Sequence, residues 1–361
     1  MKIAYVMLVD WRWIKQRPHF IAEELAEKNE VTVFYQHRYG IKGYQKTEAH
    51  GVRLKPMFVI PKGDRIPALR LLNGMIKRRI IRRSIKQEGS DCIYLTYPDQ
   101  VDVIPENFSG QIIYDCMDDH IAFISDEQRK EKLQQLERKL VDRADYVLVS
   151  SEKLRDVLCL RCGEHVNSKI TTVRNAFNGE IAAVENKQIA SKDGSLTIAY
   201  FGTISSWFDF DTIQKSIEDF PSIRYLLMGP VDHVTIPDSP NITYLGTVEH
   251  KDLQNAVSQA DCFIMPFVLN EITRSVDPVK LYEYINFCKN ILCIEYPEIE
   301  RFAPFVHFYS DYSTFKQQIA ELLEHNALKY TEQQRLVFLR ENDWKSRVMT
   351  IEQLYQSKKD A

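Results

Sequence analysis

The sequence predicts an α/β protein that consists of two consecutive Rossmann-like domains. Short apolar runs rich in β-branched residues alternate with helical segments, a pattern typical of βαβ units and a mostly parallel sheet. The stretch from Gly179 to Ser195 loses this periodicity, and the alternation then begins again. The length of 361 residues also exceeds what one ordinary hydrophobic core accommodates.

The first series of elements begins with an apolar strand at the amino terminus. Polar residues follow this strand directly, which favours a buried strand over a signal peptide. The helical segments each show one apolar face, as Phe20, Ile21 and Leu25 do in the first of them. The expected strands are Lys2–Val9, Val31–Tyr35, Asp91–Leu95, Gln111–Cys116, Tyr146–Val149 and Ile170–Val173. The expected helices are Arg17–Lys28, Ser125–Val141 and Ser151–Leu160.

The second series follows the aperiodic stretch and has the same character. Its expected strands are Leu196–Phe201, Arg224–Met228, Ile242–Tyr244, Cys262–Met265 and Ile291–Glu295. Its expected helices are Thr212–Asp219, Lys251–Ala260, Val279–Phe287, Thr314–Glu324 and Trp344–Ser357. We therefore expect an N-terminal domain over residues 1–178, a linker over 179–195, a C-terminal domain over 196–343 and a terminal helix over 344–361.

Composition and charge argue against several classes of function. The formal net charge is −3, so the molecule as a whole does not attract nucleic acid, and we expect no nucleic-acid partner. No apolar run approaches the roughly 20 residues of a membrane span. The seven cysteines are scattered and odd in number, which suits reduced thiols in the cytoplasm. Neither series opens with a G-x-G-x-x-G turn, which argues against a dinucleotide cofactor.

The stretch Thr273–Phe287 is the most informative for chemistry. Asp277 is a suitable N-cap and Pro278 suits the first helical position, so the N–H groups of the first turn offer a site for a pyrophosphate. Lys280 adds a cation in that turn, and the carboxylate of Glu283 can accept hydrogen bonds from both hydroxyls of a ribose. The same residues also fit an ordinary capped helix with solvated charges.

Two neighbouring features extend this candidate phosphate site. Gly202 and Thr203 closely follow a strand, where a glycine lets a diphosphate approach the backbone and a hydroxyl can donate to it. A tight turn explains these two residues equally well. Arg274 lies next to the predicted helix, where its guanidinium can neutralise a phosphate.

A cluster of acidic residues and a histidine marks the first domain. Asp115, Asp118, Asp119 and His120 lie at the carboxyl end of a predicted strand, the edge at which open α/β sheets bind ligands. One of these groups can accept the proton of an attacking hydroxyl, and crowding raises the pKa of a carboxylate toward a useful value. A cap-and-turn cluster and a Mg²⁺ site are the alternatives.

Several motifs together resemble a known family. The run Asp277-Pro-x-Lys-x-Tyr-Glu-Tyr resembles the donor-binding helix of GT-B glycosyltransferases, and is most similar to family 4-like and teichuronic-acid-type polysaccharide enzymes. Further segments that look like motifs of this group follow in the expected order: Trp11–His19, Tyr114–His120, Arg174–Ala176 and Tyr200–Asp209.

The resemblance implies a GT-B fold, in which two Rossmann-like domains face a central cleft and the terminal helix crosses back to the N-domain. It implies transfer of a sugar, UDP-linked in our expectation, from a nucleotide diphosphate to a lipid-linked or growing surface-polysaccharide acceptor. No cofactor and no metal are expected. The implied donor-binding residues are Glu283, Lys280, Pro278, Gly202, Thr203, Arg274, Ser275 and Tyr282.

The resemblance places the acceptor in the N-domain. Arg17, His19 and Trp13 are the expected contacts, although a satisfied arginine and a packing histidine are an equally good reading of the first two. Asp119 is the first candidate for a base, followed by Asp118 and His120. In a retaining enzyme the leaving phosphate can take the proton instead, and these residues then orient the acceptor.

The segment Lys62–Lys86 holds nine basic residues and one acidic residue. Its apolar residues Leu71, Leu72, Met75, Ile76, Ile80 and Ile81 recur at helical spacing. A basic amphipathic helix of this kind suits an anionic membrane surface, and lipid-linked precursors are built at the inner membrane. We therefore expect a cytoplasmic protein that is peripheral at this membrane. The alternative is a solvated face whose apolar stripe packs on the core.

Two other functions remain open. A nucleotide-sugar epimerase or hydrolase on the same fold needs no acceptor and has no use for the basic helix. A non-catalytic GT-B subunit that scaffolds a partner transferase predicts weak nucleotide binding. Two departures from the family pattern favour the scaffold: Ser275 stands where family 4 enzymes carry a second Glu, and Gly202–Trp207 lacks the usual phosphate-binding Arg and Lys.

Overall fold

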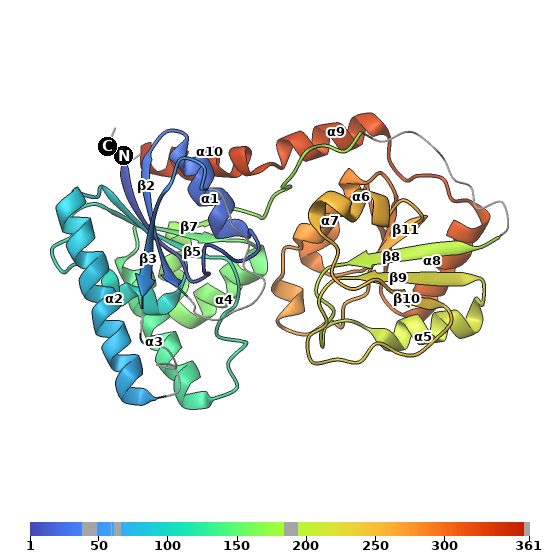
Figure 1. Cartoon of the computed structure of the whole chain (residues 1–361), viewed down its shortest axis with the longest axis horizontal. Coiled ribbons are helices and arrows are strands. Elements are labelled where there is room, and N and C mark those ends of the chain that lie inside the picture. Colours follow the sequence, from blue (N-terminus) through green and yellow to red (C-terminus); the bar gives the residue numbers. More distant parts are fainter. Residues whose placement is uncertain (38–48, 59, 61–65, 184–193, 357–361) are drawn as a thin grey trace. The chain divides into compact units, whose positions relative to one another are not determined.

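The structure is a computed structural model that describes residues 1–37, 49–58, 60, 66–183 and 194–356. The chain divides into two compact units (Figure 1). The first unit comprises Met1–Asn175 and Trp344–Ala361, and the second comprises Ala176–Asp343. The boundary thus falls slightly before the expected position 178, and residues 184–193 of the expected linker lie outside the described residues.

The first unit is built on a seven-stranded sheet with the strand order β3-β2-β1-β4-β5-β6-β7. Every pairing in it is parallel. The strands are β1 (Lys2–Val6), β2 (Glu30–His37), β3 (Arg53–Phe58), β4 (Cys92–Leu95), β5 (Gln111–Cys116), β6 (Tyr146–Val149) and β7 (Ile170–Thr172). The order reverses between β1 and β4, and this switch point is where open α/β sheets bind ligands.

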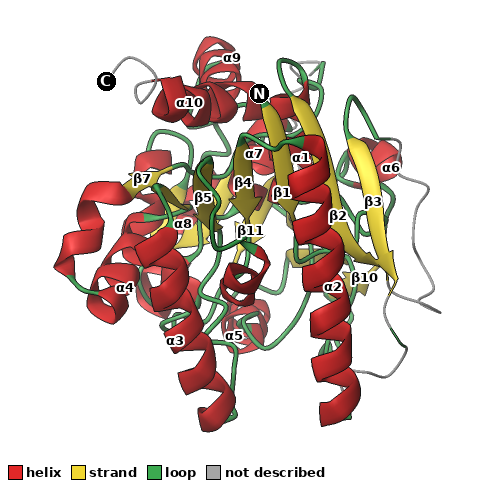
Figure 2. Cartoon of the chain, turned by 90° about the vertical axis from the view of Figure 1, so that its left-hand side faces the viewer, coloured by secondary structure: helices red, strands yellow, loops and turns green. Residues whose placement is uncertain are grey.

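Helices cover both faces of this sheet (Figure 2). Alternate residues of each strand point to opposite faces, so Ala4 and Val6 share a core with Ile81 and Leu140 of the helices on one side. These helices are α2 (Pro67–Glu88), α3 (Glu127–Arg143) and α4 (Glu152–Cys162), with the 3₁₀ turns η1 (Pro98–Val103) and η2 (Glu164–Lys169). The helices α1 (Arg17–Ala26) and α10 (Trp344–Gln356) pack against each other.

The terminal helix α10 belongs to the first unit although the chain has passed through the second, as the resemblance implied. The ring of Trp344 stacks on Phe20 of α1, with 5.4 Å between the ring centroids. At the far end of the contact, the ammonium of Lys28 lies 2.7 Å from Oε2 of Glu352. The C-terminal residues thus complete the first unit.

The second unit contains a six-stranded sheet with the order β10-β9-β8-β11-β12-β13, again with parallel pairings. The strands are β8 (Leu196–Phe201), β9 (Ile223–Met228), β10 (Ile242–Tyr244), β11 (Cys262–Met265), β12 (Asn290–Ile294) and β13 (His307–Tyr309). The helices are α5 (Phe210–Asp219), α6 (His250–Ala256), α7 (Val279–Asn286), α8 (Tyr312–Glu324) and α9 (Glu332–Glu341), with the 3₁₀ turns η3 (Thr273–Ser275) and η4 (Pro297–Phe302).

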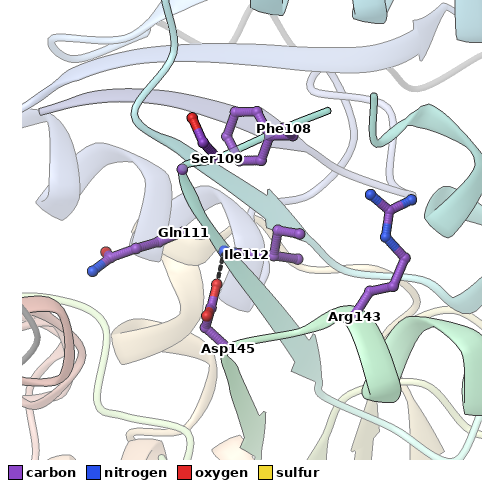
Figure 3. Close-up of a pocket in the computed structure, with 7 residues that line it drawn as sticks. Phe108, Ser109, Gln111, Ile112, Arg143 and Asp145 are labelled. Carbon is purple, nitrogen blue, oxygen red and sulfur yellow. Dashed lines mark hydrogen bonds between the residues drawn. The ribbon is translucent and has the colours of Figure 1, made fainter. Parts of the chain in front are cut away.

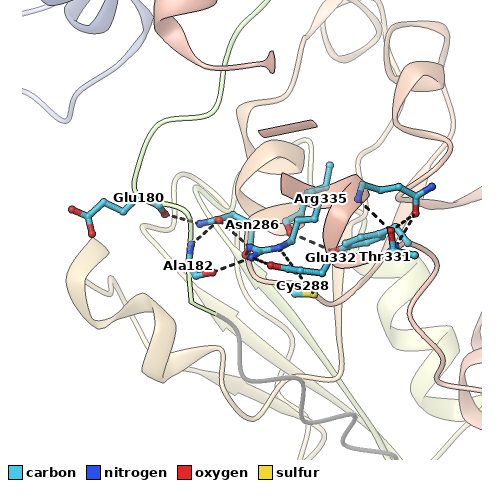
Figure 4. A network of polar contacts seen from close by, with 10 residues as sticks. Glu180, Ala182, Asn286, Cys288, Thr331, Glu332 and Arg335 are labelled. Carbon is cyan, nitrogen blue, oxygen red and sulfur yellow. Dashed lines mark hydrogen bonds and ion pairs between the residues drawn. The ribbon is translucent and has the colours of Figure 1, made fainter. Parts of the chain in front are cut away.

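A buried arginine ties α9 and α7 to the segment that enters the second unit (Figure 4). Arg335 is 1% exposed and donates to the carbonyl of Asn286, to the carbonyl of Ala182 at 3.0 Å and to Glu332 at 2.7 Å. The side chain of Asn286 in turn accepts from the backbone N–H of Ala182 and donates to the carbonyl of Glu180. These bonds fix the carboxyl end of α7.

The structure also contains elements that the periodicity did not predict: β3, β13 and α9. Strand β3 (RLKPMF) lies at the edge of its sheet and buries only Met57, so its sequence shows no apolar run. Strand β13 has three residues, which is too short for a period to be visible. The N-cap of α5 is Asp209, whose carboxylate accepts from the N–H of Thr212.

The contact between α1 and α10 predicts a test of the terminal helix. Replacing the buried Trp344 with Ala removes the stacked ring and leaves a cavity, so we expect the free energy of unfolding to fall by about 3–5 kcal/mol. Met349→Ala is the matched control, because Met349 lies on the same helix and is 48% exposed. Chemical denaturation followed by circular dichroism measures both; equal losses would contradict the packing described.

Candidate functional site

The carboxyl edge of the first sheet brings together the loops that follow β1, β4 and β5 near the switch point. The sequence-predicted acceptor and base residues all belong to these loops or to the start of α1. Parallel strands deliver every carboxyl end to one edge, so this proximity follows from the topology. Their side-chain contacts separate the residues that hold the edge together from those that face solvent.

Arg17 forms a buried ion pair and is not an exposed acceptor contact. Its Nη2 lies 2.9 Å from Oδ1 of Asp115, and its Nε lies 3.0 Å from Oδ2. The hydroxyl of Tyr94 also donates to Asp115, and Nη1 of Arg17 donates to Asn175 at 3.3 Å. Burial opposes the charge on Arg17, but Asp115 outweighs it and raises the pKa of the guanidinium. The pair fixes α1 to β5.

His19 likewise corrects the sequence interpretation. It is fully buried; its Nδ1 accepts from the backbone N–H of Gln16, and its Nε2 lies 3.2 Å from the carbonyl of Trp11. Burial lowers the pKa of His19 to about 4, so the ring is neutral near pH 7. It therefore caps α1. Trp13 is the predicted acceptor residue that reaches the surface, with 38% of its area exposed.

Asp119, the first candidate base, is held by an arginine that the sequence did not single out. Nη2 of Arg161 lies 2.7 Å from both carboxylate oxygens of Asp119. Arg161 also contacts Glu137, a buried carboxylate that accepts from the hydroxyl of Tyr114. Burial raises the pKa of Glu137. Both carboxylate oxygens of Asp119 are thus engaged by Arg161, and this contact orders the loop after β5.

Asp118 and His120 are the groups of the cluster that face away from this network. The side chain of Asp118 is exposed to solvent, but the surrounding protein partly desolvates its carboxyl and so raises its pKa. Asp115 and Asp119 add to this rise in pKa, and Arg17 opposes it. The ring of His120 lies beside that of Tyr97, with centroids 5.1 Å apart. Burial lowers the pKa of His120 to about 4, and its Nε2 has no hydrogen-bond partner within the described residues.

In the second unit, the start of α7 differs from the sequence prediction. The N-cap is Pro278, not Asp277, and a proline side chain cannot cap the helix. Asp277 is buried and pairs with Arg301, which also donates to the hydroxyl of Tyr282 at 2.9 Å. The backbone N–H groups at the amino end of a helix form a position that suits an anion.

Lys280 reaches from α7 to the glycine turn after β8. A β-carbon at Gly202 would lie 2.0 Å from Cε of Lys280, so the turn accommodates this side chain only because Gly202 has none. Gly202 also has φ +136°, and a β-carbon at Gly229 would lie 2.1 Å from the carbonyl oxygen of Gly202. Lys280 thus brings a cation to a turn whose own sequence lacks one.

The environment of Lys280 and Glu283 shifts both groups toward neutrality. Nζ of Lys280 lies 5.8 Å from the ring centroid of Tyr200 and 5.9 Å from that of Phe267. Burial lowers the pKa of Lys280, an effect that Glu283 opposes. Burial also raises the pKa of Glu283 to about 7, an effect that Lys280 opposes. Desolvated charges of this kind mark a candidate binding site.

The remaining donor candidates fall into two groups. Ser275 is buried and donates to the carbonyl of Ile272 at 2.7 Å, and Tyr282 is fully buried with its hydroxyl at Arg301, so both support the helix instead of facing a ligand. Arg274 is exposed, and its guanidinium makes no ion pair with the part of the chain that the structure describes. Thr203 is half-buried, and its carbonyl accepts from Tyr200.

One surface hollow lies away from both clusters. It measures about 620 Å³ and lies at the amino end of β5, between that strand and the end of α3 (Figure 3). Its lining includes Arg143, which donates to the carbonyl of Pro105, and Asp145, which accepts from the N–H of Ile112. No predicted site residue lines it, and it is at the sheet edge opposite to the loops that carry chemistry.

Sequence comparison identifies a curated relative. No protein-family model matches the chain. The chain is 25% identical over 240 residues to the putative teichuronic acid biosynthesis glycosyltransferase TuaH of Bacillus subtilis (strain 168). The match covers 60% of this chain and 59% of that protein, so it spans less than two thirds of the relative's length. It agrees with the predicted resemblance to teichuronic-acid-type enzymes.

Solved structures resemble the whole chain. Sucrose-phosphate synthase from Thermosynechococcus elongatus has a TM-score of 0.70 at 14% identity, with 99% of this chain and 98% of that chain covered. The lipopolysaccharide outer core galactosyltransferase WaaB has a TM-score of 0.69 at 11% identity, with coverages of 99% and 100%. Anabaena HepE, in complex with UDP and glucose, has a TM-score of 0.65 at 12% identity, with the same coverages. At these identities the likeness shows the fold alone, and it is the predicted GT-B fold.

Sequence reasoning missed the partners that decide these roles. Arg161 and Arg301 each pair with a predicted site residue, and Tyr97 lies beside His120 after β4. Tyr97 follows strand β4, which lies next to the switch point. This position is a sequence signal that could have identified Tyr97 as a candidate site residue. The two arginines carry no such signal, because they lie on a helix and a turn distant in sequence from their partners.

The buried ion pair of the first unit can be tested by a double-mutant comparison. Arg17→Met leaves the carboxylate of Asp115 buried without its counter-ion, so we expect the free energy of unfolding to fall by about 3–5 kcal/mol. Arg17→Met/Asp115→Leu removes both charges and should recover most of this loss. Denaturant titration followed by circular dichroism measures both variants, and a double variant as unstable as the single one would refute the account.

Proposed function

We propose that the chain is a glycosyltransferase that moves a sugar from a nucleotide diphosphate to a lipid-linked or growing surface-polysaccharide acceptor. The observation that carries this proposal is the amino end of α7. This helix begins at a proline N-cap, and Lys280 and Glu283 lie in its first two turns, with Lys280 against the glycine turn at Gly202. This combination suits a diphosphate followed by a ribose.

In this proposal the donor is a UDP-sugar bound by the second unit. The carboxylate of Glu283 accepts from the ribose hydroxyls, and Lys280, Arg274 and the helix end contact the diphosphate. One likeness supports UDP, since the HepE structure contains UDP and glucose. Ser275 and Tyr282 hold α7 in place and do not contact the donor.

Catalysis in this proposal is electrostatic. Negative charge develops on the departing diphosphate, and pre-oriented N–H groups and cations stabilise it without reorganising at the moment of reaction. The buried ammonium of Lys280 is well suited, because removal of water strengthens its attraction to the phosphate. This arrangement supplies the role that a metal plays elsewhere, so we propose transfer without a metal ion or cofactor.

The acceptor in this proposal binds the first unit near Trp13, Asp118 and His120. These groups are chosen over Asp119, Arg17 and His19, which are held in structural contacts. The neutral ring of His120, with a free Nε2 among the described residues, can orient or accept the proton of an attacking hydroxyl. The acceptor is carried at the cytoplasmic face of the inner membrane.

The non-catalytic scaffold is the second candidate. It is favoured by Ser275, whose hydroxyl is bonded to the backbone where family 4 enzymes have a carboxylate. Lys280 weakens this alternative, since it supplies a cation to the turn that lacks one of its own. The two candidates differ in nucleotide binding, which a functional donor site requires and a scaffold does not.

Calorimetric titration with UDP and with GDP tests the donor site. We expect UDP to bind and Glu283→Ala to weaken binding tenfold or more, about 1.4 kcal/mol, because the ribose hydroxyls lose their acceptor. Glu324→Ala is the matched control, since Glu324 lies in the same unit with its side chain 77% exposed. Absence of binding to either nucleotide would favour the scaffold.

The raised pKa of Glu283 predicts a pH dependence of nucleotide binding. The carboxylate is the form that accepts from ribose, and its pKa is about 7 in the free protein, so affinity should fall as the pH drops below 7. Between pH 8 and pH 6 we expect a decrease of roughly tenfold from this group. Binding also releases protons, which calorimetry in buffers of different ionisation enthalpy detects.

The control for this pH dependence is Glu283→Gln, which cannot titrate. The terminal phosphate of UDP also gains a proton near pH 6, about the second pKa of a phosphate ester, and this contribution remains in the variant. The difference between wild type and variant therefore reports Glu283 alone. Identical pH profiles for the two proteins would exclude the proposed role of the carboxylate.

A further inference from the structure

We propose that the amino-terminal half of α2, together with the end of β3, docks on an anionic phospholipid bilayer. Apolar side chains of this surface enter the interface, and the basic residues of the same helix contact the headgroups. The inference concerns a surface of the first unit and does not depend on the donor site. Within the described residues no helix has the length and apolar character of a membrane span, so the contact is peripheral.

The exposure of large apolar side chains is the first observation. Leu71 is 68% exposed, Met75 50%, Ile80 42% and Leu72 39%. Outside the helix, Phe58 at the end of β3 is 56% exposed, Ile66 49% and Ile60 37%. We call these seven residues the apolar surface. A water-exposed group of this size within one short part of the chain marks an interaction site in a soluble protein.

The core does not account for these side chains. The buried side of α2 is formed by Asn73, Ile81, Ser84 and Ile85, which recur at the spacing of one helix face. The four residues of the apolar surface that belong to α2 lie on the remaining arc of the helix. The alternative of an apolar stripe packed on the core therefore holds for Ile81 but not for Leu71, Leu72, Met75 and Ile80.

The surface is built from two segments that a buried side chain holds together. Oδ1 of Asn73 accepts from the N–H of Ile60 at 2.9 Å, and its Nδ2 donates to the carbonyl of Ile60 at 3.1 Å. This places the apolar residue after β3 beside the first half of the helix. Figure 2 shows that this half of α2 extends past the carboxyl ends of the strands, where it is free to meet a surface.

The charge on the helix decides what kind of surface it meets. No acidic residue occurs from Ile66 to Gln87. Lys77, Arg78 and Arg82 bond to Gln36, Asp102 and Ile104, so they are turned toward the protein. The side chains of Arg70, Arg79, Arg83 and Lys86 make no ion pair or hydrogen bond with any described residue.

An anionic membrane fits this combination better than other partners. Exposed Leu, Met and Ile beside unpaired Arg and Lys is the composition of helices that lie in a membrane interface. The unpaired cations attract anionic headgroups, and burial of the apolar side chains adds affinity that salt does not screen. Nucleic acid would use the cations but leave the apolar side chains in water. Residues 61–65 of the predicted basic segment lie outside the described residues.

The test is sedimentation of the full chain with lipid vesicles. We expect binding to vesicles that contain phosphatidylglycerol and weak binding to vesicles of phosphatidylcholine alone. Leu71→Ser/Leu72→Ser/Met75→Ser should weaken the binding by roughly tenfold or more, because three apolar side chains no longer enter the interface. Leu160→Ser is the matched control, since Leu160 is 87% exposed on α4 and outside this surface.

A charge variant separates the two contributions. Arg79→Glu/Arg83→Glu/Lys86→Glu should abolish the preference for phosphatidylglycerol and the sensitivity to salt. All six positions lie on the exposed arc of α2, so the variants should keep the wild-type melting temperature and the wild-type affinity for UDP. The vesicle measurement therefore tests the membrane contact, and the nucleotide measurement tests the donor site, independently of each other.

Three outcomes would overturn the proposal. The first is equal binding of the wild type to both kinds of vesicle or to neither. The second is a triple-serine variant that binds as well as Leu160→Ser. The third is a wild-type dimer in solution that the triple-serine variant converts to monomers, which would assign the apolar surface to a second copy of this chain.

Discussion

Parallel pairing of every strand imposes the constraint on which both units depend. Two neighbouring parallel strands cannot be joined by a tight turn, so a crossover returns the chain to the same edge each time. The carboxyl ends of β1, β4 and β5, and separately those of β8 and β11, consequently deliver their loops to one edge of each sheet. Polar residues far apart in sequence meet at this edge. The hollow at the opposite edge of the first sheet is lined by none of the candidate site residues.

Ion pairs hold these polar loops in place, and several of the charged residues at the sheet edges belong to such pairs. Burying a carboxylate or a guanidinium alone is strongly unfavourable, and ion pairs meet this requirement beside the candidate sites. Asp115 with Arg17, Asp119 with Arg161 and Asp277 with Arg301 are three such pairs. They lie directly beside the candidate ligand positions and orient the loops, while neighbouring groups remain available for binding.

The second unit shows how such a pair can create a binding position. Asp277 does not occupy the N-cap position of α7, and its carboxylate pairs with Arg301. The turn at Gly202 is open enough for Lys280 to enter it. The proposed anion site therefore depends on the helix end and on the missing side chain of Gly202, and a sequence motif does not display this arrangement.

The apolar surface on α2 follows from the same division between structural and available groups. One arc of the helix packs on the sheet through Ile81 and Ile85, and three basic residues bond to the protein. The exposed apolar residues of α2 and the side chains of Arg79, Arg83 and Lys86 take part in neither set of contacts. They are the groups that the proposed membrane contact uses.

Local signals in the sequence predicted the fold class, most element positions and the candidate donor helix α7. These signals are the alternation of apolar runs, the Pro at the start of α7 and the spacing of Lys280 and Glu283 on one helix. The sequence also located the sheet edges at which ligand binding is expected, because strand ends follow from the elements. The sequence did not predict edge strand β3 or the short strand β13, because neither shows a periodic pattern of buried apolar residues.

Contacts between distant segments determine which polar residues are available for ligand binding, and these contacts are seen only in the tertiary structure. Arg17 and Asp115 are 98 positions apart, and Asp119 and Arg161 are 42 apart, so no local pattern reveals that each is paired. The same holds for the exposure of Leu71 and Met75, whose helical spacing is compatible with a core stripe and with a free face. Pairing and burial depend on contacts between distant segments, and the physical role of a charged or apolar side chain is set by those contacts.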